Sequence, residues 1–276
     1  MPWSAQLELD YRRNGERCVV HDRHTGPLRV LASLYPEAQG VCHNVIVHPP
    51  GGIVGGDVLS VDLRLRPGSH ALLTTPGATR FYRSAGELAS QSVTARLGAG
   101  TRLEWLPQET ACHSGALATS ALHFELEGGA EMIGWDVLSL GLPASEQGFE
   151  SGRFTQTITL GRVWREHGVI DAADRRLLDS PLGLAGYRAL GLMWFAAGAP
   201  LAVARREALL HAARAACAGH SLRATSGATS PHEPAVLLRV LASRVEPVMQ
   251  LLHAVWAAWR PLAWGLPACP PRIWRT

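Results

Sequence analysis

Hydrophobic and polar residues alternate with the period of a β-strand through most of the first 165 residues. Residues 58–65 (VLSVDLRL) show this most clearly, with Asp62 and Arg64 at polar positions. Because successive side chains of a strand point to opposite faces, the spacing predicts a half-buried strand. Residues 6–11 and 89–97 have the same character. The first part of the chain is therefore predicted to be a series of strands.

Short turn sequences separate these strands every 10 to 20 residues. The Pro-Gly pair at 67–68 and the Gly-Ala-Gly stretch at 98–100 are examples, and no helical pattern interrupts them before about residue 170. Such spacing predicts an all-β body over about residues 1–200. Periodicity alone leaves a sandwich, a barrel and a solenoid open.

The last third of the chain has a different pattern. Residues 202–217 are rich in alanine, leucine and arginine and predict a helix that ends at Gly219. Residues 235–260 predict a second helix, with Pro247 as the point of a break or kink and Pro261 as its end. The predicted fold class is mainly β with late helices, an α+β arrangement.

Length and composition are ordinary for a single structural unit, and we expect one domain over residues 1–276. The chain is 47% hydrophobic and 18% charged, which suffices for a substantial core. All 26 basic residues are arginine, yet the net charge is only +3 and no arginine run occurs. Neither nucleic acid nor an anionic membrane is expected as the main partner.

Targeting signals are not evident in the sequence. The opening residues MPWSAQLELD contain neither a basic segment nor an apolar core, so no secretory signal is predicted. The most apolar stretch, 185–204, is interrupted by Arg188 and Pro200, so no transmembrane helix is expected. Five cysteines without a CxxC pair argue against a disulfide framework and fit a reducing cytoplasm.

Glycines are concentrated in residues 48–57 (HPPGGIVGGD), where the backbone is expected to need positive φ or a close approach by another group. The four glycines are Gly51, Gly52, Gly55 and Gly56. Asp57 follows them and could brace the turn through its carboxylate. The block lacks both GxGxxG and GK[ST], so it is neither a Rossmann fingerprint nor a P-loop. It remains either a tight turn on the core or a surface for a partner.

Signatures of catalysis and of permanent metal binding are missing. The sequence contains no HExxH, C-x₂-C, H-x₃-H or G-x-S-x-G pattern. Twelve histidines motivate a metal-storage hypothesis, although weak, transient metal contacts through scattered ligands would leave no spacing signature.

Several carboxylates lie beside bulky rings, as in Glu104-Trp105 and Trp135-Asp136. Such an acid either faces outward from its strand or occupies a polar position along an internal cavity or passage. A β-solenoid enzyme acting on carbohydrate, with Glu104 and Glu109 as paired acids, is the alternative of a different class. It requires two carboxylates about 5–10 Å apart in an open cleft.

Five blocks of sequence, in this order, resemble the UreD (UreH) family of urease accessory proteins. They are 26–28 with 35–37 (GPL and YPE), 48–57 (HPPGGIVGGD), 74–84 (TTPGATRFYRS), 103–109 (LEWLPQE) and 271–276 (PRIWRT). The motif and interface candidates within them are Gly51, Gly52, Gly55, Gly56, Asp57, Arg80, Tyr82, Arg83, Glu104, Trp105, Gln108, Arg272 and Trp274.

This resemblance implies a β-helix-like stack of strands that acts as a non-catalytic chaperone of nickel insertion in nitrogen metabolism. It implies binding to UreF, which recruits the GTPase UreG, and to apo-urease, within a dimeric complex organised by UreF. It implies no permanently bound cofactor, with nickel only in transit. The implied nickel passage is lined by Thr79 and Asp136, with Asp174 as a third candidate.

Two positions depart from the family pattern. Leu142, in residues 140–146, and Leu266, in residues 264–268, occupy places where the family usually has arginine. Two arginines that could brace loops or meet acidic partners are therefore missing from this chain.

Overall fold

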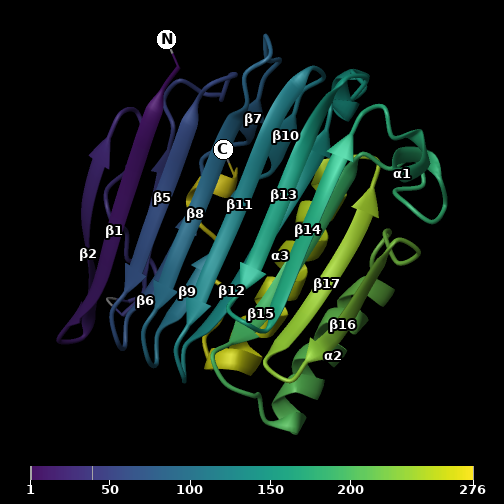
Figure 1. The fold of residues 1–276 in the computed structure, drawn as a ribbon. Coiled ribbons are helices and arrows are strands. Elements are labelled where there is room, and N and C mark those ends of the chain that lie inside the picture. The colour runs from purple at the N-terminus through teal and green to yellow at the C-terminus, as the bar shows by residue number, and fades with distance from the viewer. Residues whose placement is uncertain (1, 39, 276) are drawn as a thin grey trace.

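Residues 2–38 and 40–275, described here in a computed structural model, form two stacked β-sheets with helices against one of them (Figure 1). The first sheet contains β14 (Trp164–Asp171), β13 (Gly152–Leu160), β11 (Ala116–Leu126), β8 (Ala89–Leu97), β5 (Val58–Leu65), β1 (Ser4–Asn14) and β2 (Arg17–Thr25), in that spatial order.

The second sheet is ordered β16 (Ser226–His232), β17 (Ala235–Ala242), β15 (Ala189–Ala197), β12 (Glu131–Leu140), β9 (Arg102–Trp105), β6 (His70–Thr74), β4 (Cys42–Val47) and β3 (Arg29–Val30). Two short strands, β7 (Thr79–Phe81) and β10 (Thr110–Cys112), extend β12 at one corner. The helices are α1 (Arg175–Asp179), α2 (Val203–Ala218) and α3 (Val245–Trp264), with 3₁₀ turns η1 (Pro143–Ser145) and η2 (Arg272–Arg275).

The chain winds as a β-solenoid of about four coils. It alternates between the sheets from β4 to β5, β6 to β8, β9 to β11 and β12 to β13. Neighbouring coils pair in parallel, as β5 does with β8 and β6 does with β9. The mainly β class with late helices is confirmed, and among the architectures left open by periodicity the solenoid is the one observed.

Alternation in the sequence fills the space between the two sheets. In β5, Leu59, Val61 and Leu63 are buried, whereas Val58 and Arg64 are exposed. The second sheet differs because β6 is buried along its whole length. Its outer face is covered by α3, and α2 packs against α3 and β16 (Figure 1). One sheet therefore keeps a solvated face, whereas the other is enclosed on both sides.

The helix predicted over 235–260 is wrong in its first part. Residues 235–242 form β17, which pairs with β15, and α3 begins only at Val245. A short apolar run such as AVLLRVLA fits a buried strand and a helix equally well by periodicity. Pro247 lies in the first turn of α3, where a missing N–H is tolerated, and Pro261 lies inside the helix rather than after it.

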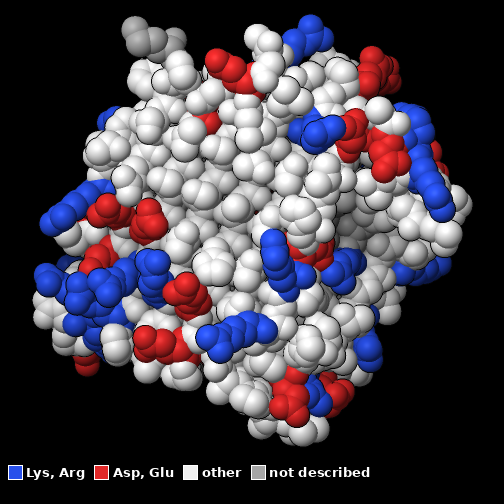
Figure 2. Space-filling model, viewed as in Figure 1, with Lys and Arg blue, Asp and Glu red and all other residues white. Residues whose placement is uncertain are grey.

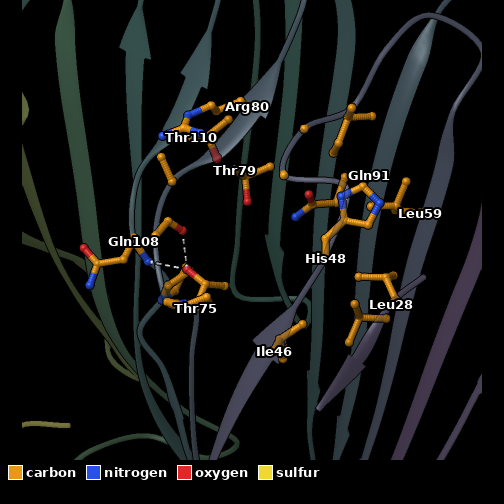
Figure 3. A pocket seen from close by; sticks show the side chains of 18 of the residues that line it. Leu28, Ile46, His48, Leu59, Thr75, Thr79, Arg80, Gln91, Gln108 and Thr110 are labelled. Atoms are coloured by element: carbon orange, nitrogen blue, oxygen red, sulfur yellow. Dashed lines mark hydrogen bonds between the residues drawn. The ribbon is translucent and has the colours of Figure 1, made fainter. Parts of the chain in front are cut away.

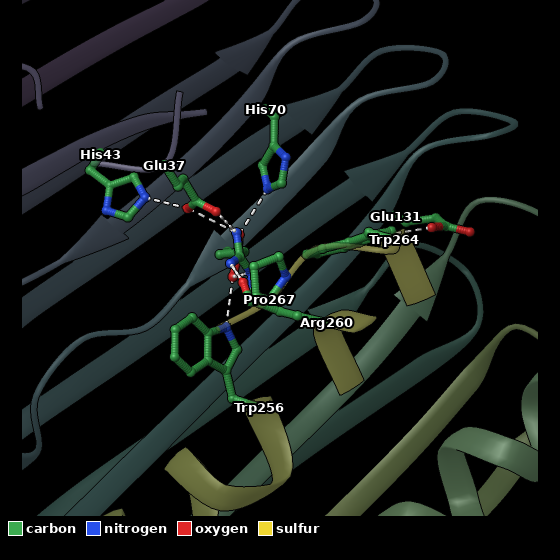
Figure 4. A network of polar contacts seen from close by, with 9 residues as sticks. Glu37, His43, His70, Glu131, Trp256, Arg260, Trp264 and Pro267 are labelled. Carbon is green, nitrogen blue, oxygen red and sulfur yellow. Dashed lines mark hydrogen bonds and ion pairs between the residues drawn. The ribbon is translucent and has the colours of Figure 1, made fainter. Parts of the chain in front are cut away.

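A buried polar network joins α3 to the solenoid (Figure 4). The Glu104 carboxylate, which is fully buried, accepts hydrogen bonds from His70 Nε2 at 2.8 Å and Trp256 Nε1 at 2.6 Å. Arg260, also fully buried, donates from Nη2 to Glu104 at 3.1 Å and to Glu37 at 2.7 Å. Each buried charge is therefore paired with an opposite one, which burial of charge requires.

This network fixes the ionisation of Glu104. Burial by itself would raise the pKa of this carboxyl, but the His70 hydrogen bond and the Arg260 charge hold it below its ordinary value. Glu104 is thus an ionised structural group that is fully buried. The alternative of a carbohydrate-active enzyme requires Glu104 and Glu109 as paired acids in an open cleft. Burial of Glu104 leaves that alternative without one of its two carboxylates.

Among the described residues, no helix combines the length and the apolar character that crossing a membrane would need.

Candidate functional site

Two of the signature blocks, 48–57 and 74–84, lie above one another at a single corner of the solenoid. Ile53 bridges in parallel to Phe81, and Phe81 pairs with Cys112. Cys112 in turn pairs with Leu140. The blocks at 48–57 and 74–84, together with β10, therefore occupy equivalent positions in successive coils. Their order in the sequence reflects this stacking, although they do not form a recognisable sequence repeat.

The block at 48–57 needs glycine both for positive φ and for the close approach of another group. Gly51 and Gly56 have φ of +78° and +88°, a region that other residues rarely adopt. A Cβ on Gly52 would lie 2.0 Å from Cε2 of the Tyr82 ring in the next coil. Asp57, 1% exposed, accepts hydrogen bonds from the backbone N–H of Trp3 at 2.6 Å and of Val54 at 3.0 Å. The block is therefore braced from within, as expected for Asp57.

A cavity of about 320 Å³, here called the corner cavity, lies between the two sheets beneath this corner (Figure 3). Its polar lining includes Thr79, Gln91, His48 and Asp136. Figure 3 shows the side chains of Thr79 and Gln91 reaching into the same space from opposite walls. The ring Nε2 of His48 is buried and has no hydrogen-bond partner among the residues that the structure describes. Burial lowers the pKa of His48, although Asp57 opposes the shift, so its imidazole is neutral.

A second cavity of about 490 Å³, here called the edge cavity, lies beside the last coil. Its polar lining includes Asp136, Gln156, Glu166 and Arg239. Asp136 belongs to the lining of both cavities. The two cavities therefore share a single carboxylate of β12.

The environment of Asp136 is poor in positive charge. From the described part of the chain its carboxylate accepts one hydrogen bond, from Gln156 Nε2 at 2.5 Å, and only 9% of the residue is exposed. Burial raises the pKa of Asp136 to about 6, the Gln156 bond lowers it in part, and the nearby Glu166 raises it further. Near neutral pH this carboxylate is ionised and has no partner cation among residues 2–38 and 40–275, so it can attract a cation that enters either cavity.

The predicted passage residues are not all brought together. Thr79 lines the corner cavity and Asp136 lines both cavities. Asp174 instead forms the N-cap of α1, where its carboxylate accepts the N–H of Leu177 at 2.9 Å, and it is not part of either lining. The acidic group that joins Asp136 in the edge cavity is Glu166. Its place in the alternating sequence of β14 gives no sign of this role.

The remaining motif residues divide between the cavity and the surface. Those that line the corner cavity are Gly51, Gly52, Arg80, Trp105 and Gln108. Tyr82 and Arg83 are exposed beside it, and Gly55 approaches the Ser84 hydroxyl. The interface candidates are thus concentrated at one corner, whereas Glu104 lies inside the α3 network.

The C-terminal block folds back onto the second sheet. The Trp274 ring stacks on His253 with 4.4 Å between centroids, and its Nε1–H donates to Thr74 Oγ1 at 2.8 Å. Arg272 opens the 3₁₀ turn η2, and Thr276 lies outside the described residues. This places the last block next to the start of 74–84.

The two leucines at usual arginine positions lie in different parts of the fold. Leu266 packs against the core cluster around α3. Leu142 precedes η1 and pairs with Gln147 in an isolated antiparallel bridge.

Within residues 2–38 and 40–275, no group of three or more histidine, cysteine, aspartate or glutamate side chains is placed to hold a metal ion. The metal-storage hypothesis, which rested on twelve histidines, therefore finds no cluster to support it. What the site offers is two adjoining cavities with sparse oxygen and nitrogen donors, an arrangement suited to weak and reversible contact with a cation.

Comparison with known proteins identifies the family. The family model described as UreD urease accessory protein matches residues 4–275. The chain is 58% identical over 276 residues to the urease accessory protein UreD of Variovorax paradoxus, with all of both chains covered. It is 57% identical over 278 residues to that of Leptothrix cholodnii and 51% identical over 296 residues to that of Methylibium petroleiphilum, again over the full length of each. The chain therefore belongs to the UreD family of urease accessory proteins.

Proposed function

We propose that this chain is a non-catalytic, cytoplasmic scaffold of urease maturation that passes nickel toward the urease active site. In this proposal it binds UreF, which recruits the GTPase UreG, and docks on apo-urease within a dimeric assembly. Family membership supports the urease part of the proposal. The observation that carries the nickel part is the position of Asp136, an unpaired carboxylate shared by two adjoining cavities.

The donors along the cavities suit a cargo rather than a resident ion. Nickel accepts imidazole, carboxylate and neutral oxygen ligands. The corner cavity provides the neutral His48 ring and the Thr79 hydroxyl, and Asp136 adds one carboxylate. Sparse ligands of this kind hold an ion weakly, so that it can be released to the next site.

The tryptophans of α3 do not provide a binding surface for a partner. Trp256 and Trp259 lie on the buried side of α3 and are almost fully buried, so they serve the core. The exposed residues of the stacked corner, including Tyr82 and Arg83, remain available to a partner. We therefore assign the corner of the solenoid, rather than the tryptophan-rich face of α3, to contacts with the maturation complex.

Co-expression with UreF and the urease subunits of the same genome, followed by affinity pull-down and size-exclusion chromatography, tests the scaffold proposal. We expect the chain to co-elute with UreF and with apo-urease, but not with mature urease. A chain that runs alone as a soluble monomer would contradict partner binding. Full nickel loading of urease at limiting nickel after deletion of the gene would contradict the maturation role.

A further inference from the structure

The edge cavity is bounded by two strands that belong to different sheets. Glu166 lies on β14, the last strand of the first sheet, and Arg239 lies on β17 of the second sheet. No backbone pairing joins these two strands among the described residues. An ion pair between Arg239 Nη2 and Glu166 Oε2 spans them instead. The opening at this side of the molecule is therefore crossed by side chains alone.

The ion pair lies nearer the surface than the carboxylate behind it. The side chains of Arg239 and Glu166 are 55% and 33% exposed, whereas Asp136 is 9% exposed. All three line the edge cavity. Figure 2 shows the surface hollowed between β14 and β17, with charged groups beside the hollow. The pair is thus placed at the mouth of the cavity and Asp136 at its inner end.

A closure of this kind can open readily. Exposed ion pairs add little net stability because water competes for both partners. The Arg239 guanidinium also lies over the Trp164 ring, 5.7 Å from its centroid, which gives it a second resting contact on β14. Separation of Arg239 from Glu166 would leave two carboxylates, Glu166 and Asp136, lining one cavity, with the Gln156 amide bound to Asp136.

We propose that Arg239 is a cationic gate of the edge cavity, held closed by Glu166 and displaced when a divalent cation occupies Glu166 and Asp136 together. This inference rests on the proposed nickel-passing function. The guanidinium and the cation compete for the same carboxylate, so each weakens binding of the other. The gate therefore keeps the edge cavity closed until a cation arrives. Because the guanidinium competes with the cation, the site does not hold an ion permanently.

Nickel binding to the full-length chain, measured by equilibrium dialysis with Ni²⁺ alone, tests the gate. Removal of one positive charge close to a divalent ion strengthens its binding, and we expect Arg239→Gln to bind Ni²⁺ about tenfold more tightly than the wild type. Arg239→Lys, which keeps the charge, should stay near the wild type. Adding Glu166→Gln to Arg239→Gln should remove the gain, since one of the two carboxylates is then neutral.

A matched control is provided by Arg153, whose ion pair with Asp171 also involves β14 and is similarly exposed, at 61% and 33%. Arg153 is not part of either cavity lining. Arg153→Gln should leave Ni²⁺ binding unchanged. Equal binding by Arg239→Gln and the wild type would overturn the gate, as would an equal gain in Arg153→Gln.

A second measurement separates failure of the gate from failure of the proposed function. Nickel content of urease at limiting nickel is compared in cells with the wild-type chain, with Arg239→Gln and without the chain. Loss of loading without the chain, combined with wild-type binding by Arg239→Gln, refutes the gate alone. Full loading without the chain refutes the nickel-passing function, and the gate with it.

Discussion

Two buried carboxylates on adjacent strands of the second sheet have opposite surroundings. Glu104 on β9 pairs in register with Ile133 of β12, three residues before Asp136. Glu104 is matched by His70, Trp256 and Arg260, whereas Asp136 has one amide donor and two cavities. Both acids follow or precede a tryptophan, so local sequence does not distinguish them. The difference teaches that a buried charge marks a site only where the fold leaves it incompletely paired.

The pKa directions express this contrast in energetic terms. The pKa of Glu104 is held below its ordinary value, so its ionised form stabilises the fold above the unfolded pKa, and this stability is lost as the pH falls. The pKa of Asp136 is raised to about 6, so between about pH 4 and 6 the folded state binds the proton more tightly than the unfolded state. Its contribution to stability therefore falls as the pH rises through that window.

The largest expected effect is the loss of stability in Glu104→Gln. This change leaves Arg260 buried without its full counter-charge, and breaking a buried pair in this way costs about 3–5 kcal/mol. Chemical denaturation at pH 7.5 measures it. Glu109→Gln is the matched control, because Glu109 lies outside the network, and it should change stability by less than about 0.5 kcal/mol. Similar losses in both variants would contradict the role assigned to the network.

A smaller effect of opposite sign is expected for Asp136→Asn. The difference between the ordinary aspartate pKa of 3.8 and the folded value of about 6 corresponds to about 3 kcal/mol at a pH above both. Asparagine avoids this cost but alters the Gln156 hydrogen bond, so we expect a net gain of about 1–3 kcal/mol at pH 7.5.

Denaturation midpoints between pH 4 and 8 check this expectation. The wild type should lose stability relative to Asp136→Asn as the pH rises from 4 to 6. A variant that is less stable than the wild type at pH 7.5, with an unchanged pH profile, would show that Asp136 is as fully satisfied as Glu104.

The smallest effect is expected for Trp274→Phe, on the outer face of the second sheet. Phenylalanine keeps a ring against His253 but cannot donate to Thr74, so the cost is about 0.5–1.5 kcal/mol. Thermal unfolding followed by circular dichroism measures it. Because Trp274 has no role in the proposed nickel passage, nickel loading of urease should not change. A loss of loading in a variant of wild-type stability would connect the tail to the passage.

Alternation and turn sequences are sufficient to predict the solenoid strands. In β5 the buried leucines and valine follow the sequence pattern residue by residue. The helix prediction fails over 235–242 because β17 is enclosed between β15 and β16 and by α3, so its sequence is apolar without alternation. Alternation in the sequence marks a strand when one of its faces is solvated. The prediction fails where tertiary packing covers both faces.

The site is predictable only where a local motif marks it. Thr79 and Asp136 belong to segments with recognisable neighbours, and the structure places both beside the corner cavity. Glu166 and Arg239 are 73 residues apart and meet only because β14, at the edge of the first sheet, approaches β17 of the second. The sequence suggests Asp174 as a third lining residue of the passage, yet its carboxylate caps α1. Cavity linings depend on long-range packing that no local pattern encodes.

The central claim is that Asp136 carries nickel between the two cavities, and nickel content of urease at limiting nickel tests it most directly. Asp136→Asn is compared with Asp174→Asn in cells that contain the other accessory proteins. Asp174→Asn is a suitable control because asparagine also serves as an N-cap. We expect Asp136→Asn to lower the nickel content about tenfold, as loss of a ligand-shell group does, and Asp174→Asn to leave it unchanged. Equal nickel content in the two variants and the wild type would contradict the account.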